Sequence, residues 1–124
     1  YLLYERGKAM QEAVPVGKGS MLAILGAKIE DISDLLNSFK GKGVCEIAND
    51  NADGQVIISG DKDNVVSFQS LLKEKKIKSI PLKVSAPFHC SLMKSAADNM
   101  SDKIKNTNFR SPTHSILSNV TAKI

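Results

Sequence analysis

The sequence predicts an α+β fold, and three observations lead to this expectation. Between residues 20 and 84, apolar segments typical of strands and helices follow the order β-α-β-β-α-β. The turn sequence Asn51-Ala52-Asp53-Gly54 separates the second strand from the third and predicts a hairpin. Pro81 lies in the fourth strand and lacks the N–H that a central ladder needs, so this strand is expected at a sheet edge. The pattern is that of a ferredoxin-like sandwich, in which two helices cover one face of an antiparallel sheet and strands two and four form its edges.

The first predicted element is a helix over residues 1–13, where apolar and polar side chains alternate at helical spacing. Gly7 lies inside it. A glycine in a helix costs about 1 kcal/mol relative to alanine, so we expect another backbone to pass close to this position. Pro15, Gly17 and Gly19 then break the helix and are interpreted as a linker.

The sheet and its two helices occupy the middle of the chain. Strands are expected at 20–26, 44–49, 55–59 and 79–84. One helix is expected at 28–40, with an apolar face formed by Ile29, Ile32, Leu35, Leu36 and Phe39. The other begins at Asp61, a suitable N-cap, and presents Val65, Val66, Phe68, Leu71 and Leu72.

The last third of the chain predicts a helix at about 92–106 and a short strand at Ser115–Ser118. Nothing in the small sheet requires these elements. With residues 1–13 they are expected to belong to a second layer whose remainder lies elsewhere, and to be less well ordered than the sheet or to make contacts between chains. Because the sequence opens in mid-helix without an initiator Met, we expect a piece of a longer protein.

Composition excludes several classes of function. With 124 residues, 42% of them hydrophobic and 24% charged, the chain can form an ordinary globular core. Aromatic residues make up 5%, and none lies in the four predicted strands, so a sheet that stacks nucleic-acid bases is not expected. The net charge of +4 is mild, and the segment 73–78 concentrates lysines at a helix end. A solvated helix end and a docking site for an acidic protein are both open interpretations of that segment.

Cysteine usage and hydropathy bear on location and on metals. Cys45 and Cys90 lie far apart and lack the spacing of a zinc site or a disulfide framework. No apolar run reaches the length of a membrane span, and the start lacks the pattern of a signal peptide. We therefore expect a cytoplasmic protein without a metal, a cofactor or a membrane partner.

His89 is the best catalytic candidate that the residues offer. It lies where the apolar run after the fourth strand gives way to the last helix. Pro87 fixes its own φ and biases Ala86 toward extended geometry, so this segment should hold His89 in a defined direction. A neutral imidazole can accept a proton near pH 7. The alternative is that His89 is a half-buried polar residue at a strand end.

Four segments together carry a resemblance to a known family. They are Arg6–Ala13, Ala48–Asn51, Gly54–Gly60 and Ser85–Met93. In order and spacing they resemble malonyl-CoA:acyl carrier protein transacylases, and the similarity runs nearly end to end. That family combines a large hydrolase-like α/β lobe, which carries a G-x-S-x-G nucleophile elbow, with an inserted ferredoxin-like lobe. Neither the elbow serine nor the glutamine of the oxyanion hole has a match in this chain.

The resemblance implies a division of the chain and a role for several residues. Residues 1–14 would be a helix of the large lobe, 15–84 the small lobe, and 85–124 the return segment that carries the catalytic histidine. His89 would be the general base for the missing serine, and Arg6 would pair with the free carboxylate of the malonyl group.

Three further residues would contact the substrate. Phe88 would favour malonyl over methylmalonyl by filling the room of a branching methyl. Asn49 and Asn51 would line the cleft near the substrate, although simple turn chemistry explains them equally well. Cys90 and Ser91 are interpreted as structural, because neither has an activating neighbour that the sequence reveals.

The implied activity is transfer of malonyl from CoA to acyl carrier protein in fatty-acid synthesis, through an acyl-enzyme on serine. Acyl carrier proteins are acidic in this family, so the segment 73–78 could help to dock one. The chain alone lacks the nucleophile and is expected to be inactive. The competing hypothesis is a stand-alone ferredoxin-like module for protein interaction or regulation, because fold alone does not settle function.

Overall fold

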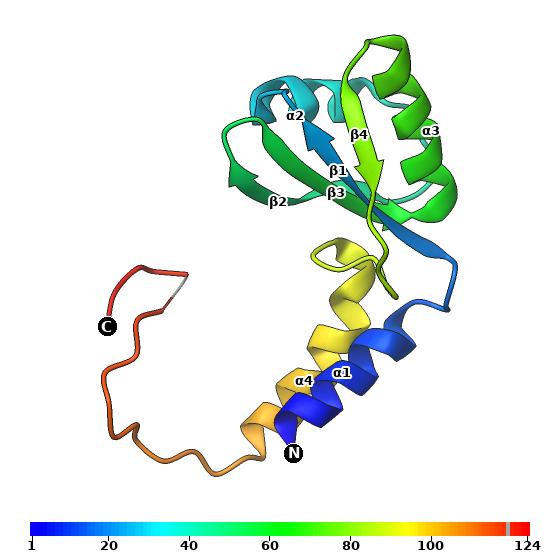
Figure 1. The fold of residues 1–124 in the computed structure, drawn as a ribbon. Coiled ribbons are helices and arrows are strands. Elements are labelled where there is room, and N and C mark those ends of the chain that lie inside the picture. Colours follow the sequence, from blue (N-terminus) through cyan, green and yellow to red (C-terminus); the bar gives the residue numbers. More distant parts are fainter. Residues whose placement is uncertain (119) are drawn as a thin grey trace.

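A computed structural model describes residues 1–118 and 120–124 and shows two packed units (Figure 1). One is a sheet covered by helices. The other is a pair of helices side by side beneath it, after which the chain extends away without regular structure. The elements are α1 (Leu2–Ala13), β1 (Gly19–Leu25), α2 (Ile29–Ser38), β2 (Cys45–Ala52), β3 (Gln55–Asp61), α3 (Lys62–Glu74), β4 (Lys78–Pro81), the 3₁₀ turn η1 (Ser91–Met93) and α4 (Lys94–Lys105).

The sheet has the strand order β2-β3-β1-β4, and every neighbouring pair is antiparallel. The predicted fold, its hairpin and its two edge strands are thereby confirmed. β4 ends at Pro81, three residues before the predicted end. The ladder stops at Pro81, and one further bond, from the Leu82 N–H to the Met21 carbonyl at 3.0 Å, holds the chain before it leaves the sheet.

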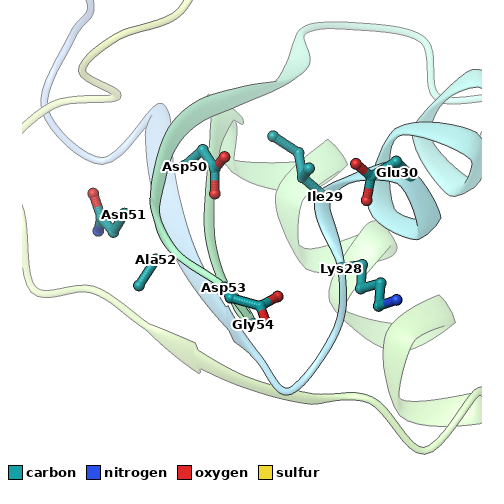
Figure 2. A pocket seen from close by; sticks show the side chains of 8 residues that line it. All are labelled: Lys28, Ile29, Glu30, Asp50, Asn51, Ala52, Asp53 and Gly54. Atoms are coloured by element: carbon teal, nitrogen blue, oxygen red, sulfur yellow. The ribbon is translucent and has the colours of Figure 1, made fainter.

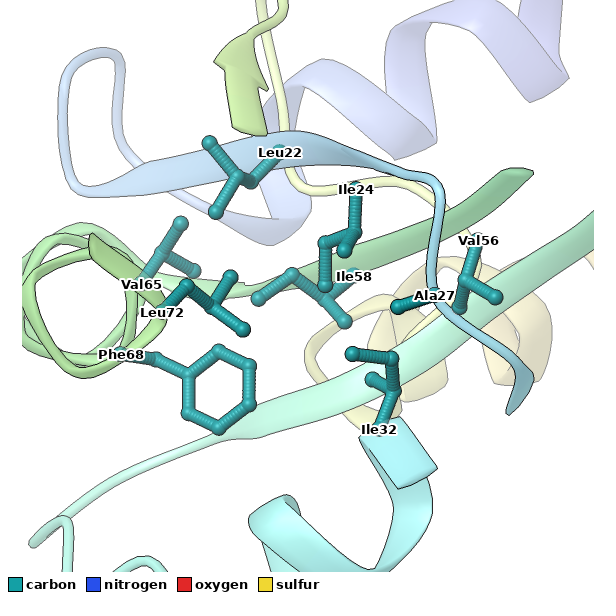
Figure 3. Packing of buried hydrophobic residues seen from close by; sticks show 9 residues of the cluster. All are labelled: Leu22, Ile24, Ala27, Ile32, Val56, Ile58, Val65, Phe68 and Leu72. Atoms are coloured by element: carbon teal, nitrogen blue, oxygen red, sulfur yellow. The ribbon is translucent and has the colours of Figure 1, made fainter. Parts of the chain in front are cut away.

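Helices α2 and α3 cover one face of the sheet and enclose the main core (Figure 3). Phe68 is fully buried, and its ring meets that of Phe39 edge to face at 5.3 Å. The buried members of this core are Leu22, Ile24, Ala27, Ile32, Val56, Ile58, Val65, Phe68 and Leu72. The prediction that Val66 belongs to the apolar face of α3 is wrong, because its side chain is 50% exposed.

The segment after β4 covers part of the second face of the sheet. Met21, Ala23 and Ile57 are buried there, and Phe88 packs against them. Pro87 lies so close to β1 that a Cβ added to Gly19 would be 2.3 Å from its ring carbons. Gly19 is the first residue of β1 and lies against Pro87. The prediction that Gly19 belongs to a linker is wrong.

Asp61 precedes α3 as predicted, but its carboxylate does not cap that helix. It accepts the Val44 backbone N–H at 2.6 Å and so ties the start of β2 to the end of β3. The N-cap interpretation is right in position and wrong in its hydrogen bond.

The two flanking helices pack on each other. Ala9 of α1 and Ala96 and Met100 of α4 form a second buried cluster, and Lys103 reaches Glu5 at 2.8 Å. The side chains of this pair are 30% and 19% exposed. Each of the two helices therefore buries part of its apolar surface against the other.

Two expectations about the flanking segments are not met. Beyond the backbone of its own helix, no atom of the described chain lies within 4 Å of a Cβ built at Gly7, so no other backbone passes there. Residues 115–118 form no strand, and no strand of the described ranges pairs with them. An isolated apolar stretch of four residues cannot satisfy its backbone groups in a ladder without such a neighbour.

Candidate functional site

His89 ends the segment that crosses the second face of the sheet, and its side chain is exposed. Its φ of +60° lies in the left-handed region, which costs a residue with a side chain about 1 kcal/mol or more. Residues on both sides must hold this conformation. Ala86 and Pro87 are buried before it, and the Phe88 N–H bonds the Ala86 carbonyl at 3.1 Å.

A hollow of about 400 Å³ lies between His89 and the sheet. Met21, Ala23 and Ile57 form its apolar floor. Asn49, Asn51 and Phe88 line it together with His89. The structure therefore brings four of the five predicted site residues to one cavity.

A bulge in β2 explains how Asn49 reaches this cavity. Ile47 pairs with Ile58 and packs on the helix side of the sheet, whereas Asn49 pairs with Ile57, which faces the cavity. Strict alternation would point residues 47 and 49 to the same face. The register shift between them adds one residue and turns Asn49 to the opposite face.

A second hollow, of about 420 Å³, lies on the other side of His89. Arg6 and Met10 of α1 line it, together with His89, Met93 and residues of α4. Its walls are mostly apolar methionine and alanine side chains. Arg6 is exposed and is the one cation of this lining. His89 thus lies between a cavity with amide side chains and a cavity with a guanidinium.

Two contacts that the sequence analysis missed tie these walls together. The Gln11 side-chain amide donates to the Ser85 hydroxyl at 2.8 Å and links α1 to the segment before His89. The Glu46 carboxylate accepts the backbone N–H of Ser91 at 2.8 Å and its hydroxyl at 2.5 Å. Gln11 and Ser85 lie in segments that carry the family resemblance. Nothing in the sequence singles out Glu46.

A third hollow beside the β2–β3 turn has a different character (Figure 2). Asp50 points toward Ile29 and Glu30, while Asn51 points to the other side of the hairpin. Asn51 borders both this hollow and the cavity beside His89. No Ser, Cys or His side chain lines this hollow, whereas a histidine lies between the other two, so we place the candidate site at His89.

Neither cysteine shows the features of a nucleophile. Partial burial, together with the charges of Glu46 and Cys90, raises the pKa of Cys45 to about 11. The Cys90 thiol donates to the Pro87 carbonyl at 3.2 Å and so helps to fix the turn that carries His89. Over the described ranges, no three His, Cys, Asp or Glu side chains gather as a metal site would require. In the same residues, no helix is both long and apolar enough to cross a bilayer.

Comparisons with known proteins place these observations in a wider context. No family model matches the chain. A malonyl CoA-acyl carrier protein transacylase of Haemophilus influenzae is 42% identical over 119 residues, which are 95% of this chain and 38% of that protein. The corresponding protein of Escherichia coli K12 is 39% identical, over 98% of this chain and 40% of that protein. The chain therefore spans about two fifths of the length of the curated relatives that it matches.

Solved structures of malonyl transacylases also match nearly all of this chain and about two fifths of their own length. The crystal structure of FabD from Acinetobacter baumannii is 43% identical with a TM-score of 0.86, over 98% of this chain and 39% of that one. A malonyl-transacylase in complex with a type II polyketide acyl carrier protein is 38% identical with a TM-score of 0.88, over 99% of this chain and 40% of that one. At these identities the similarity covers sequence as well as fold.

Proposed function

Because the chain is homologous to malonyl CoA-acyl carrier protein transacylases over about two fifths of their length, we propose that it supplies the base and the carboxylate anchor of malonyl transfer. It would act with a nucleophilic serine from a part of the relatives that it does not span. The observation that carries the proposal is the position of His89, which borders one cavity with Arg6 and another with Asn49, Asn51 and Phe88.

Arg6 would bind the free carboxylate of the malonyl group. A guanidinium offers two parallel N–H donors that match the two oxygens of a carboxylate. An acetyl group has no carboxylate, so Arg6 would select the dicarboxylic acyl group.

His89 would act as the general base. One ring nitrogen takes the proton of the serine hydroxyl while the oxygen attacks the thioester carbonyl, and the C–S bond then breaks. The protonated imidazole gives that proton to the departing CoA thiolate. The same steps in reverse, with the thiol of the carrier protein as nucleophile, release the malonyl group from the serine.

The other cavity residues would orient and select the acyl group. The Phe88 ring limits the room beside His89 and would disfavour a methyl branch. Asn49 and Asn51 offer amide donors and acceptors to the thioester end of the substrate.

The remaining parts of the proposal concern organisation and location. Residues 1–14 and 85–124 would belong to a larger lobe, and residues 15–84 form the small lobe. The packing of α1 on α4 supports grouping the two flanking segments. A cytoplasmic location is supported by Cys45 and Cys90, which are both free thiols.

Substrate selectivity in the complete enzyme tests the proposal. Arg6→Ala should lower kcat/KM for malonyl-CoA about 10- to 100-fold, the scale of charge-assisted hydrogen bonds, and leave transfer of acetyl unchanged or faster. Arg110→Ala removes an exposed cation that lines neither cavity and serves as the matched control. Equal losses with both acyl groups would make Arg6 a structural residue.

The activity of the 124-residue chain alone separates the proposal from its competitors. Mixed with malonyl-CoA, the chain should show no acylation by mass spectrometry, because the nucleophile and the oxyanion donors are absent. Acylation at Ser91 or Cys90 would contradict the proposal. In the complete enzyme, His89→Ala should slow acyl-enzyme formation about 100-fold or more.

A further inference from the structure

The left-handed backbone of His89 needs support that its own residue type does not give. A φ of +60° is readily adopted by glycine and is disfavoured for histidine. Before His89, the buried Pro87 packs against Gly19, and Phe88 packs on the sheet. These contacts fix the chain up to the histidine. They leave open what fixes the chain after it.

The chain after His89 enters η1, and the N-cap position of this turn lacks a side-chain cap of its own. Cys90 occupies that position with extended backbone and makes no capping bond. The carboxylate of Glu46, a residue of the edge strand β2, accepts both the N–H and the hydroxyl of Ser91. Glu46 therefore acts as a cap supplied from 45 residues away in the sequence.

Two features make this contact stronger than an ordinary surface hydrogen bond. The acceptor is a carboxylate that takes both the N–H and the hydroxyl of Ser91, and bonds to a carboxylate are charge-assisted. Glu46 is itself half-buried and held in the ladder opposite Ser59. A carboxylate on a paired strand has less freedom to lose than one on a loop.

Glu46 also lies three residues before Asn49 on the same strand. On β2, Asn49 thus lines the cavity beside His89, and Glu46 binds Ser91 in the segment that follows His89. We propose that Glu46 is a positioning residue, which through Ser91 holds His89 in its left-handed conformation and in register with Asn49. The effect on acyl transfer rests on the function proposed above, whereas the effect on the backbone of His89 does not.

The backbone effect is testable by NMR on the 124-residue chain. The HN–Hα NOE within His89 should be strong, because these protons lie closest together when φ is positive. Glu46→Ala should weaken this NOE and shift the His89 signals, and leave those of His114 unchanged. Glu46→Gln keeps one acceptor oxygen and should give a smaller change. Glu30→Gln makes the same substitution at a position that does not contact Ser91 and should have no effect.

A double-mutant cycle shows whether the effect passes through Ser91. Ser91→Ala removes the hydroxyl donor and keeps the N–H, so its change should be smaller than that of Glu46→Ala. Combined with Glu46→Ala it should add nothing. Should Glu46→Ala fail to fold, Glu46→Gln and Ser91→Ala still provide the test. Unchanged His89 signals in both Glu46→Gln and Ser91→Ala would overturn the proposal. It would also be overturned if the shifts of the His89 signals in the double variant equalled the sum of those in Glu46→Ala and Ser91→Ala.

Kinetics in the complete enzyme give the functional measure. Glu46→Ala should lower kcat about 10- to 100-fold, the scale of a misplaced catalytic group, with little change in KM. A variant that loses stability but keeps kcat would show a merely structural role and refute the positioning. If the wild-type complete enzyme transfers no malonyl, the proposed function fails, while the NMR result still decides what Glu46 does to His89.

Discussion

Substituting Gly19 with alanine should disturb His89 without touching the candidate site. The added Cβ would lie 2.3 Å from Cγ and Cδ of Pro87 and 2.8 Å from its Cβ. Carbon atoms pack favourably at about 3.5–4.0 Å, so the two groups must separate by about 1 Å or more. Gly19 is paired with Asp61 in the ladder, and the proline ring is stiff. The group that yields should therefore be the segment that carries Pro87 and His89.

The expected cost is that of overpacking a filled site, about 1–3 kcal/mol in the free energy of unfolding. Urea denaturation of the 124-residue chain measures this change, and the NMR signals of His89 report the displacement. Gly7→Ala is the matched control, because nothing lies within 4 Å of its Cβ and a helical alanine should stabilise the chain by about 1 kcal/mol. Stability within about 0.5 kcal/mol of wild type for Gly19→Ala, with His89 signals unmoved, would refute the reasoning.

Three further predictions concern thiol reactivity, pH and selectivity. Alkylation of Cys45 in a Cys90→Ser variant should be slow at pH 8 and rise about tenfold per pH unit, since burial raises its pKa to about 11; fast labelling at pH 8, detected by mass spectrometry, would contradict this. The hydrogen bond between the Lys103 ammonium and the Glu5 carboxylate lowers the pKa of Glu5 from its usual 4.5 and raises the pKa of Lys103 from its usual 10.5. Wild type should therefore be more stable than Glu5→Gln at neutral pH, and this difference should vanish as pH falls through the lowered pKa of Glu5 or rises through the raised pKa of Lys103. A difference in urea denaturation that does not change with pH would argue against the ion pair. In the complete enzyme, Phe88→Ser should raise the kcat/KM for methylmalonyl-CoA relative to malonyl-CoA, and an unchanged ratio would remove Phe88 from the selectivity argument.

The features that sequence predicted well are those with a local physical cause. Short apolar runs bounded by turn residues predicted the strands, helical periodicity predicted α2 and α3, and the missing N–H of Pro81 predicted the edge. The family resemblance selected the five candidate residues, and the structure places all of them on the two cavities around His89. Their roles in a reaction stay predictions.

The two glycines show where such reasoning ends. Gly7 interrupts a helix and was the position where a close backbone was expected, yet its surroundings in the described chain are open. Gly19 was interpreted as part of a linker and is the glycine that Pro87 approaches, 68 positions further along the chain. Composition around a glycine cannot reveal a contact of this kind, because the approaching group is set by tertiary packing.

The bulge in β2 has the same origin and a larger consequence. Without the register shift between Ile47 and Asn49, strict alternation would place Asn49 on the same face as Ile47, where it would bury an amide against an apolar core. Glu46 and Asn49 are three positions apart, so simple alternation would put them on opposite faces of the sheet. With the bulge, both lie on the face that carries His89. An edge strand tolerates such a bulge because its other side has no ladder to disrupt. The position of β2 at the edge, which the sequence does predict, is thus what allows one strand to line the cavity and to hold the histidine beside it.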